Sequence, residues 1–150
     1  MTTDLEDLYR EVILDHARRP RRSGLREPFT TEVHQVNPLC GDEVTMRVRV
    51  SGQGERAVVA DVSYESLGCA VSVAATSVLA ESVTGGTVAD AHAAYERFRD
   101  IVTGAVEVDD ATAAEADEAA FAGVARLPRR VKCALLGWTA LREALLRSGR

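Results

Sequence analysis

The sequence has no apolar run that approaches the roughly 18 residues needed to cross a bilayer, so no membrane-spanning helix is predicted. Its first ten residues, MTTDLEDLYR, are acidic and polar, unlike a secretory signal or a transit peptide. No internal repeat and no low-complexity linker is visible. We therefore expect a single cytoplasmic domain over residues 1–150 that does not bind membranes.

Cysteine is scarce, and the three cysteines are Cys40, Cys69 and Cys133. In a chain without an export signal, structural disulfides are not expected. There is no CxxC pair, so local spacing alone does not establish a zinc site. Three roles stay open for these thiols: small buried apolar residues, metal ligands or a reactive group.

Basic residues are fewer than acidic ones, 18 against 23, which gives a formal net charge of −5. This balance argues against binding the phosphate backbone of nucleic acids as the main task. Hydrophobic residues make up 46% of the chain, and a domain of this length buries a core without disulfides.

The periodicity of apolar residues changes from helix to sheet and back to helix. A helix is predicted up to Pro20, followed by strands at about 31–36, 44–50 and 57–65. Further helices are predicted at 69–83, 87–103 and from Pro128 to about 147, with Trp138 in the core. This order predicts an α+β fold, a small antiparallel sheet with helices packed against it. Seven acids and no base between Asp100 and Ala125 predict an exposed loop with a short helix.

The segment Asn37-Pro38-Leu39-Cys40-Gly41-Asp42 reads as a tight turn that presents a thiol and a carboxylate two residues apart. Cys69 follows Gly68 at the start of a predicted helix, and Cys133 falls in the first turns of the last helix. Thiols near helix N-termini lose their proton more readily, because they face the positive end of the helix dipole. Three thiolates and one carboxylate make a tetrahedral set, and sulfur favours Zn²⁺ or iron–sulfur ligation.

The sequence resembles the U-type iron–sulfur cluster assembly proteins, and within them the SufU branch. The similarity runs through LYREVILDHARRPRRSG, NPLCGDEV, ESLGCAVSVAATSVL and RVKCALLGW, in that order. It implies a SufE/NifU-like fold in which Cys40, Asp42, Cys69 and Cys133 bind the metal. His16 matches the opening motif, and a capping or packing role is its simpler interpretation. His34 and His92 match no motif.

Two features favour the SufU branch over the IscU-type scaffolds. Lys132 stands where the scaffolds have a histidine before the third cysteine, and the segment between the second and third motifs, about 87–127, is long. Arg130 matches an arginine of SufU-type members and would share a helix face with Cys133. Its guanidinium would offset the surplus negative charge of a Cys₃Asp zinc site, which suggests a supporting role.

The resemblance implies a zinc-dependent sulfur carrier rather than a conventional turnover enzyme. In that family, a PLP-dependent, SufS-like cysteine desulfurase supplies persulfide sulfur to the first-motif thiol, here Cys40, by ligand exchange on zinc. A SufBCD-like assembly complex is the implied downstream partner. The alternative is a scaffold that assembles and transfers a [2Fe–2S] cluster on the same four residues, and a structural zinc domain is a third interpretation.

Overall fold

The computed structural model describes residues 2–106 and 117–148, with side chains from Tyr9 onward. Each predicted helix and strand is present, and the observed ends agree with the predicted ones to within about two residues. No helix among the described residues is long and apolar enough to cross a bilayer. In chain order the elements, with η for 3₁₀ helices, are α1 (Thr2–Arg18), β1 (Thr31–Asn37), β2 (Asp42–Ser51), η1 (Gly54–Arg56), β3 (Val58–Leu67), α2 (Ala70–Val83), α3 (Val88–Thr103), η2 (Asp117–Arg126) and α5 (Pro128–Ser148).

The three strands form one antiparallel sheet in the order β1-β2-β3, which confirms the predicted α+β fold. The alternation read from the sequence sets its two faces, because Val44, Met46 and Val48 are buried while the residues between them are partly exposed. The ladder between β2 and β3 shifts register between Arg49 and Val50, far from the β1–β2 turn.

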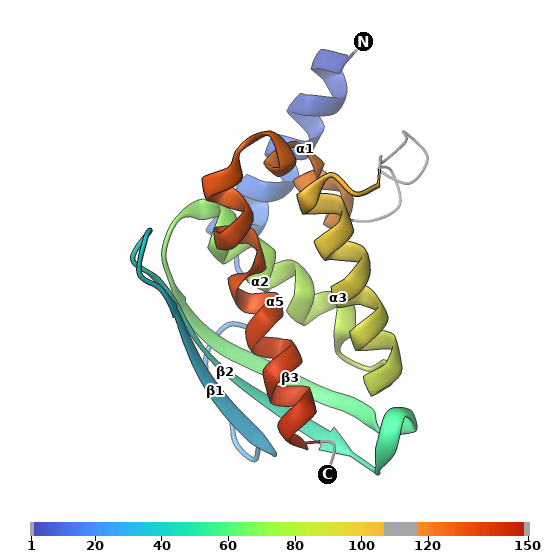
Figure 1. Ribbon diagram of the computed structural model, residues 1–150. Helices are drawn as coiled ribbons and strands as arrows, with labels where there is room; N and C mark the ends of the chain where they lie inside the picture. The colour runs from blue at the N-terminus through green and yellow to red at the C-terminus, as the bar shows by residue number, and fades with distance from the viewer. Residues whose placement is uncertain (1, 107–116, 149–150) are drawn as a thin grey trace.

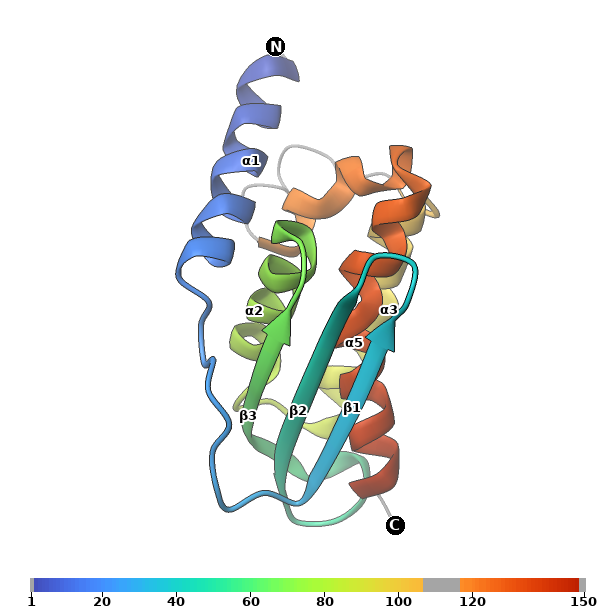
Figure 2. The same ribbon diagram turned by 90° about the vertical axis from the view of Figure 1, so that its left-hand side faces the viewer.

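The helices cover one face of the sheet, and the other face is open (Figure 1, Figure 2). α2 and α5 lie directly on the strands, while α3, α1 and η2 pack on the far side of these two helices. α2 is therefore buried almost all round, which explains why its sequence is apolar on every side. Trp138 of α5 is fully buried, as predicted, and stacks on Phe98 of α3.

The prediction for the acidic segment is correct in its short helix, and its expected exposure is wrong for the part that forms this helix. Residues 107–116 lie outside the described residues. From Asp117 the chain forms η2, which buries Glu118 and Phe121 against α3. Arg97 donates two hydrogen bonds to the Glu118 carboxylate, at 2.8 and 3.2 Å. The positive charge of Arg97 offsets the cost of burying the Glu118 carboxylate, which the acidic composition of the segment had led us to expect in solvent.

The crossing of α2 and α5 is tight at Gly137. A Cβ at this position would lie 2.3 Å from Thr76 Oγ1 and 3.1 Å from Thr76 Cβ. The Thr76 hydroxyl is fixed, because it donates to the Ser72 carbonyl at 2.9 Å. The absence of a side chain at Gly137 thus sets the separation of the two helices that cover the sheet.

We predict that Gly137→Ala lowers the free energy of unfolding by about 1–3 kcal/mol, because the new methyl group overpacks a close helix contact. The melting temperature should fall by several degrees in thermal unfolding followed by circular dichroism. Gly123→Ala is the matched control, since no atom lies within 4 Å of the added Cβ and no strain is expected. Equal melting temperatures for the two variants would contradict the tight crossing.

Candidate metal-binding site

Three segments that are distant in the sequence meet at one end of the sheet. These are the β1–β2 turn with Cys40 and Asp42, the β3–α2 junction with Cys69, and the start of α5 with Cys133. Figure 2 shows the turn, the end of β3 and the start of α5 at the same end of the molecule. The structure therefore brings all the predicted site residues to one region.

The β1–β2 turn holds Cys40 outward. The backbone N–H groups of Cys40 and Gly41 donate to the Asn37 carbonyl, at 3.3 and 2.9 Å, and the N–H of Leu39 donates to Asn37 Oδ1. Gly41 has φ +73°, a left-handed conformation that glycine adopts without strain. Cys40 is exposed as a result, unlike the other two cysteines.

Asp42 connects the turn to the second motif. Its carboxylate is 1% exposed and accepts a hydrogen bond from the backbone N–H of Cys69 at Oδ1, 3.0 Å. The Cys69 thiol lies 3.8 Å from Asp42 Oδ2. Gly68 makes this approach possible, because a Cβ there would lie 2.3 Å from Asp42 Oδ1. Sequence reasoning noted Gly68 only as the point where the helix pattern begins, and its position before Cys69 was the available signal.

Cys133 is fully buried beneath Cys40. Its thiol donates to Cys40 Sγ at 3.3 Å, and the Arg129 carbonyl lies 3.7 Å away. The position near a helix N-terminus predicts a lowered pKa for this thiol, whereas its surroundings shift the pKa in the opposite direction. Burial raises the pKa of Cys133 above its usual value, and the neighbouring Asp42 and thiols raise it further.

Arg130 lies where the sequence placed it, on the Cys133 side of α5. The thiols of Cys69 and Cys133 raise the pKa of its guanidinium, with Cys69 contributing most. The side chain is exposed, so its positive charge borders the site without being buried in it.

The donor types suit a thiophilic metal, and three of the four predicted ligands lie within reach of one ion. The ligand atoms of Cys40, Asp42 and Cys133 lie within 4.8 Å of one another, whereas Cys69 lies outside this group, with its thiol 3.8 Å from Asp42 Oδ2. Zinc bonds of about 2.0–2.3 Å place neighbouring donors about 3.3–3.8 Å apart.

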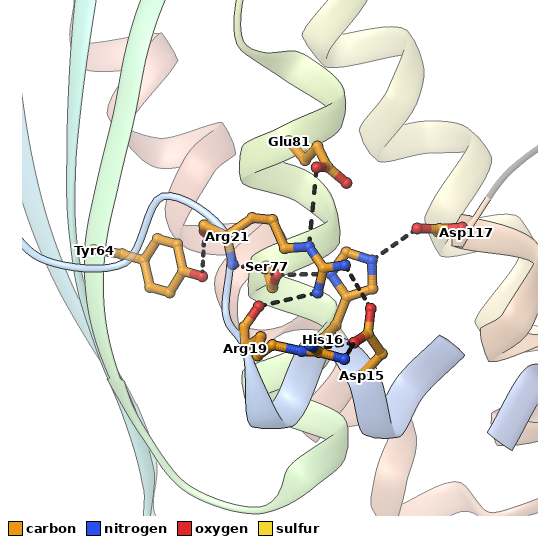
Figure 3. Close-up of polar contacts among 8 residues, drawn as sticks. All are labelled: Asp15, His16, Arg19, Arg21, Tyr64, Ser77, Glu81 and Asp117. Carbon is orange, nitrogen blue, oxygen red and sulfur yellow. Dashed lines mark hydrogen bonds and ion pairs between the residues drawn. The ribbon is translucent and has the colours of Figure 1, made fainter. Parts of the chain in front are cut away.

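His16 lies in a different cluster, between α1, α2 and η2 (Figure 3). Its Nδ1 is 2.7 Å from Ser77 Oγ and its Nε2 is 2.7 Å from Asp117 Oδ2. A serine, a histidine and a carboxylate in this order resemble a hydrolytic triad. Both His16 and Ser77 are buried, however, and the N–H of Arg21 already donates to Ser77 Oγ. These contacts agree with the packing role predicted for His16.

The same cluster does not fit a metal, although ligand atoms of His16, Glu81 and Asp117 lie within 4.8 Å of one another. The Arg21 guanidinium lies 4.0 Å from Glu81 and pairs with Asp15. Asp15 is the main cause of the raised pKa of Arg21, and Glu81 and Asp117 add to it. The positive charge that these carboxylates need is thus already supplied by Arg21 (Figure 3).

The chain is similar to known proteins over most of its length. The profile of the NifU-like N-terminal domain family matches residues 8–145. The zinc-dependent sulfurtransferase SufU of Bacillus subtilis is 33% identical over 95% of this chain and 92% of its own. The iron–sulfur cluster assembly scaffold protein IscU of Streptococcus pyogenes is also 33% identical, over 96% and 86%.

The fold is shared with solved structures. A protein of Fervidobacterium islandicum, described as an iron–sulfur cluster assembly scaffold protein for the SUF system, superposes with a TM-score of 0.74 and 32% identity. The match covers 90% of this chain and 94% of that chain.

We predict that Gly68→Ala displaces the Asp42 carboxylate and breaks its bond to the Cys69 N–H, which should cost about 1–3 kcal/mol of unfolding free energy. Metal affinity should fall with it. Gly24→Ala is the control for backbone strain, because Gly24 also has positive φ, +99°, yet no atom lies within 4 Å of an added Cβ. Denaturant unfolding and zinc titration are the measurements. Equal losses of stability and of zinc affinity in the two variants would contradict the idea that a side chain at Gly68 displaces the Asp42 carboxylate.

Proposed function

Because this chain belongs to the NifU-like N-terminal domain family, whose profile matches residues 8–145, we propose that it is a zinc-dependent sulfur carrier for iron–sulfur cluster biosynthesis. Its donor would be a PLP-dependent, SufS-like cysteine desulfurase, and its acceptor a SufBCD-like complex. In this proposal, residues 1–150 form one domain that acts in the cytoplasm. It is supported by the similarity to SufU, and the equal similarity to IscU makes the choice between carrier and scaffold the question to test.

One observation carries the proposal: the three thiols differ in exposure. Cys133 is buried, Cys69 is partly buried and Cys40 is exposed on a turn. A sulfur atom that must be reached by a thiol of another protein has to be accessible, and Cys40 is the most accessible of the three cysteines. We therefore assign Cys40 as the sulfur acceptor and Cys69, Cys133 and Asp42 as the residues that stay in place.

The transfer step needs no net oxidation. The Cys40 thiolate attacks the outer sulfur of the partner's persulfide, a new S–S bond forms, and the partner's cysteine leaves as a thiolate. Cys40 then carries the persulfide. A zinc ion held by Cys40, Asp42, Cys69 and Cys133 would supply positive charge that keeps these thiols ionised at neutral pH. Arg130 adds positive charge at the rim of the site and is assigned a supporting role.

The second candidate function is a scaffold that holds a [2Fe–2S] cluster on the same four residues. Sulfur donors do not discriminate sharply between zinc and iron, so the donor set is compatible with both. Lys132 before the third cysteine and the long segment between the second and third motifs favour the carrier. Part of that segment, 107–116, lies outside the described residues.

We predict one zinc ion per chain, and loss of most of it in Cys69→Ala and in Cys133→Ala. Both variants should also melt several degrees lower, because metal binding contributes to folding stability. Ser72→Ala is the control: Ser72 is buried in α2, and its hydroxyl has no hydrogen-bond partner within the described residues. Metal analysis and calorimetry measure both effects. Full zinc content in the two cysteine variants would overturn the ligand assignment.

The choice between carrier and scaffold is tested with Cys40→Ala and Asp42→Ala. If the protein is a carrier, mass spectrometry after incubation with desulfurase and cysteine should find the added sulfur on Cys40. The Cys40→Ala variant should keep its fold but no longer stimulate the desulfurase. Asp42→Ala should also reduce stimulation of the desulfurase. Loss of this carboxylate would weaken zinc binding and leave Cys40 less well ordered for ligand exchange. Anaerobic reconstitution with iron and sulfide should give no stable cluster. A stable cluster that Asp42→Ala retains for longer, with stimulation unchanged, would establish the scaffold instead.

A further inference from the structure

A cavity of about 640 Å³ opens beside the Cys40 thiol. Two segments line it: the β1–β2 turn, through Asn37, Leu39 and Cys40, and the first turns of α5, through Arg129, Arg130 and Lys132. Its volume falls in the range of sites that bind small molecules. Three of its residues are cationic and none is acidic, in a chain whose net charge is −5.

Two of the three cations of this pocket have no carboxylate partner, unlike many arginines elsewhere in the described structure. Elsewhere, arginines such as Arg22, Arg26 and Arg97 pair with carboxylates. Among the residues that the structure describes, no carboxylate pairs with Arg129 or Lys132, and both are exposed. The N-terminal end of α5, a helix of 21 residues, adds the positive end of its dipole to the same place. The pocket is therefore a local region of positive potential.

An independent observation comes from Asn37. This residue lines the cavity and is 7% exposed. Its Oδ1 accepts from the Leu39 N–H, but its Nδ2 is buried with no hydrogen-bond partner within the described part of the chain. A buried amide donor without a partner is uncommon and costs stability unless something accepts its hydrogen bond. Asn37 lines the cavity but its Nδ2 is closed off from solvent, so a carboxylate in the pocket becomes its acceptor after a small movement of the side chain.

From the cavity, its unpaired cations and the buried Asn37 amide, we propose that this pocket binds the carboxylate of a small acidic thiol, of the cysteine class, and presents its sulfur to Cys40. The small thiol would act as a sulfur acceptor. Its thiolate attacks the outer sulfur of the Cys40 persulfide, a new S–S bond forms, and the bond to Cys40 Sγ breaks, so that Cys40 leaves as a thiolate. No electron donor or acceptor is required. This step rests on the proposed function, whereas the anion pocket itself does not.

The pocket is tested first by alkylation, without any sulfur transfer. Anionic iodoacetate and neutral iodoacetamide are reacted separately with the protein as purified, and the rate at Cys40 is followed by peptide mass spectrometry. The expected result is that Arg129→Gln/Lys132→Gln lowers the iodoacetate-to-iodoacetamide rate ratio by about threefold to tenfold, because the local field concentrates anions. The ratio is compared among proteins of equal zinc content, so that any effect of bound metal on it is the same in each.

Arg18→Gln/Arg56→Gln is the matched control, since it changes the net charge equally at exposed positions outside the pocket. It should leave the ratio unchanged, and zinc content should be the same in all three proteins. Equal ratios in the wild type and both double variants would overturn the anion pocket.

The thiol class is tested next, on protein persulfidated at Cys40. Sulfur release to 3-mercaptopropionate is compared with release to 2-mercaptoethanol, and the ratio of the two rates should fall about threefold to tenfold in the pocket variant but not in the control. If the alkylation ratio falls while this ratio does not, the pocket serves an acidic side chain of a protein partner and the small-thiol proposal is wrong. If Cys40 never becomes persulfidated, the proposed function fails, while the alkylation result stands by itself.

Discussion

The site depends on one contact, the hydrogen bond from the Cys69 backbone to the buried Asp42 carboxylate. It ties the start of β2 to the start of α2, and it exists only because Gly68 has no side chain. A carboxylate at 1% exposure needs partners, and here they are the Cys69 backbone and the neighbouring thiols. The same contact therefore stabilises the sheet end and preorganises two of the four candidate ligands.

A second constraint comes from the different depths of the thiols. α5 carries Cys133 into the core, close to the tight crossing with α2 at Gly137, whereas the Gly41 turn leaves Cys40 at the surface. A candidate ligand on a turn is displaced by an incoming group more easily than one held by a helix, because a turn rearranges at a lower cost in free energy. One exposed thiol on a turn, beside donors held by helices, suits the sulfur transfer that we propose. A purely structural zinc site has no need of this asymmetry.

The sequence predicted the fold well where the signal was local. Periodicity and capping signals located the strands and the α-helices of the described residues, and the Asn37–Asp42 motif located the turn, whereas the short 3₁₀ helix η1 was not predicted. The prediction failed where the decisive surroundings come from distant residues. Glu118 is buried and paired with Arg97 of α3, and burial raises the pKa of Cys133 although this residue lies near a helix N-terminus. The role of Gly68 toward Asp42, 26 positions earlier, likewise needs the three-dimensional contact. Such pairings leave no mark in the spacing of a single sequence.

Net charge is the clearest case of a global property that conceals a local one. The chain is acidic overall, yet the mouth of its candidate site is lined by Arg129, Arg130 and Lys132. Three thiolates and a carboxylate around a doubly charged metal ion leave about two negative charges in excess, which by themselves would repel an anionic reactant. Arg130 lies toward the thiols and offsets part of that excess. Arg129 and Lys132 remain free of carboxylates in the described structure, so the approach to Cys40 stays favourable for a negatively charged sulfur compound.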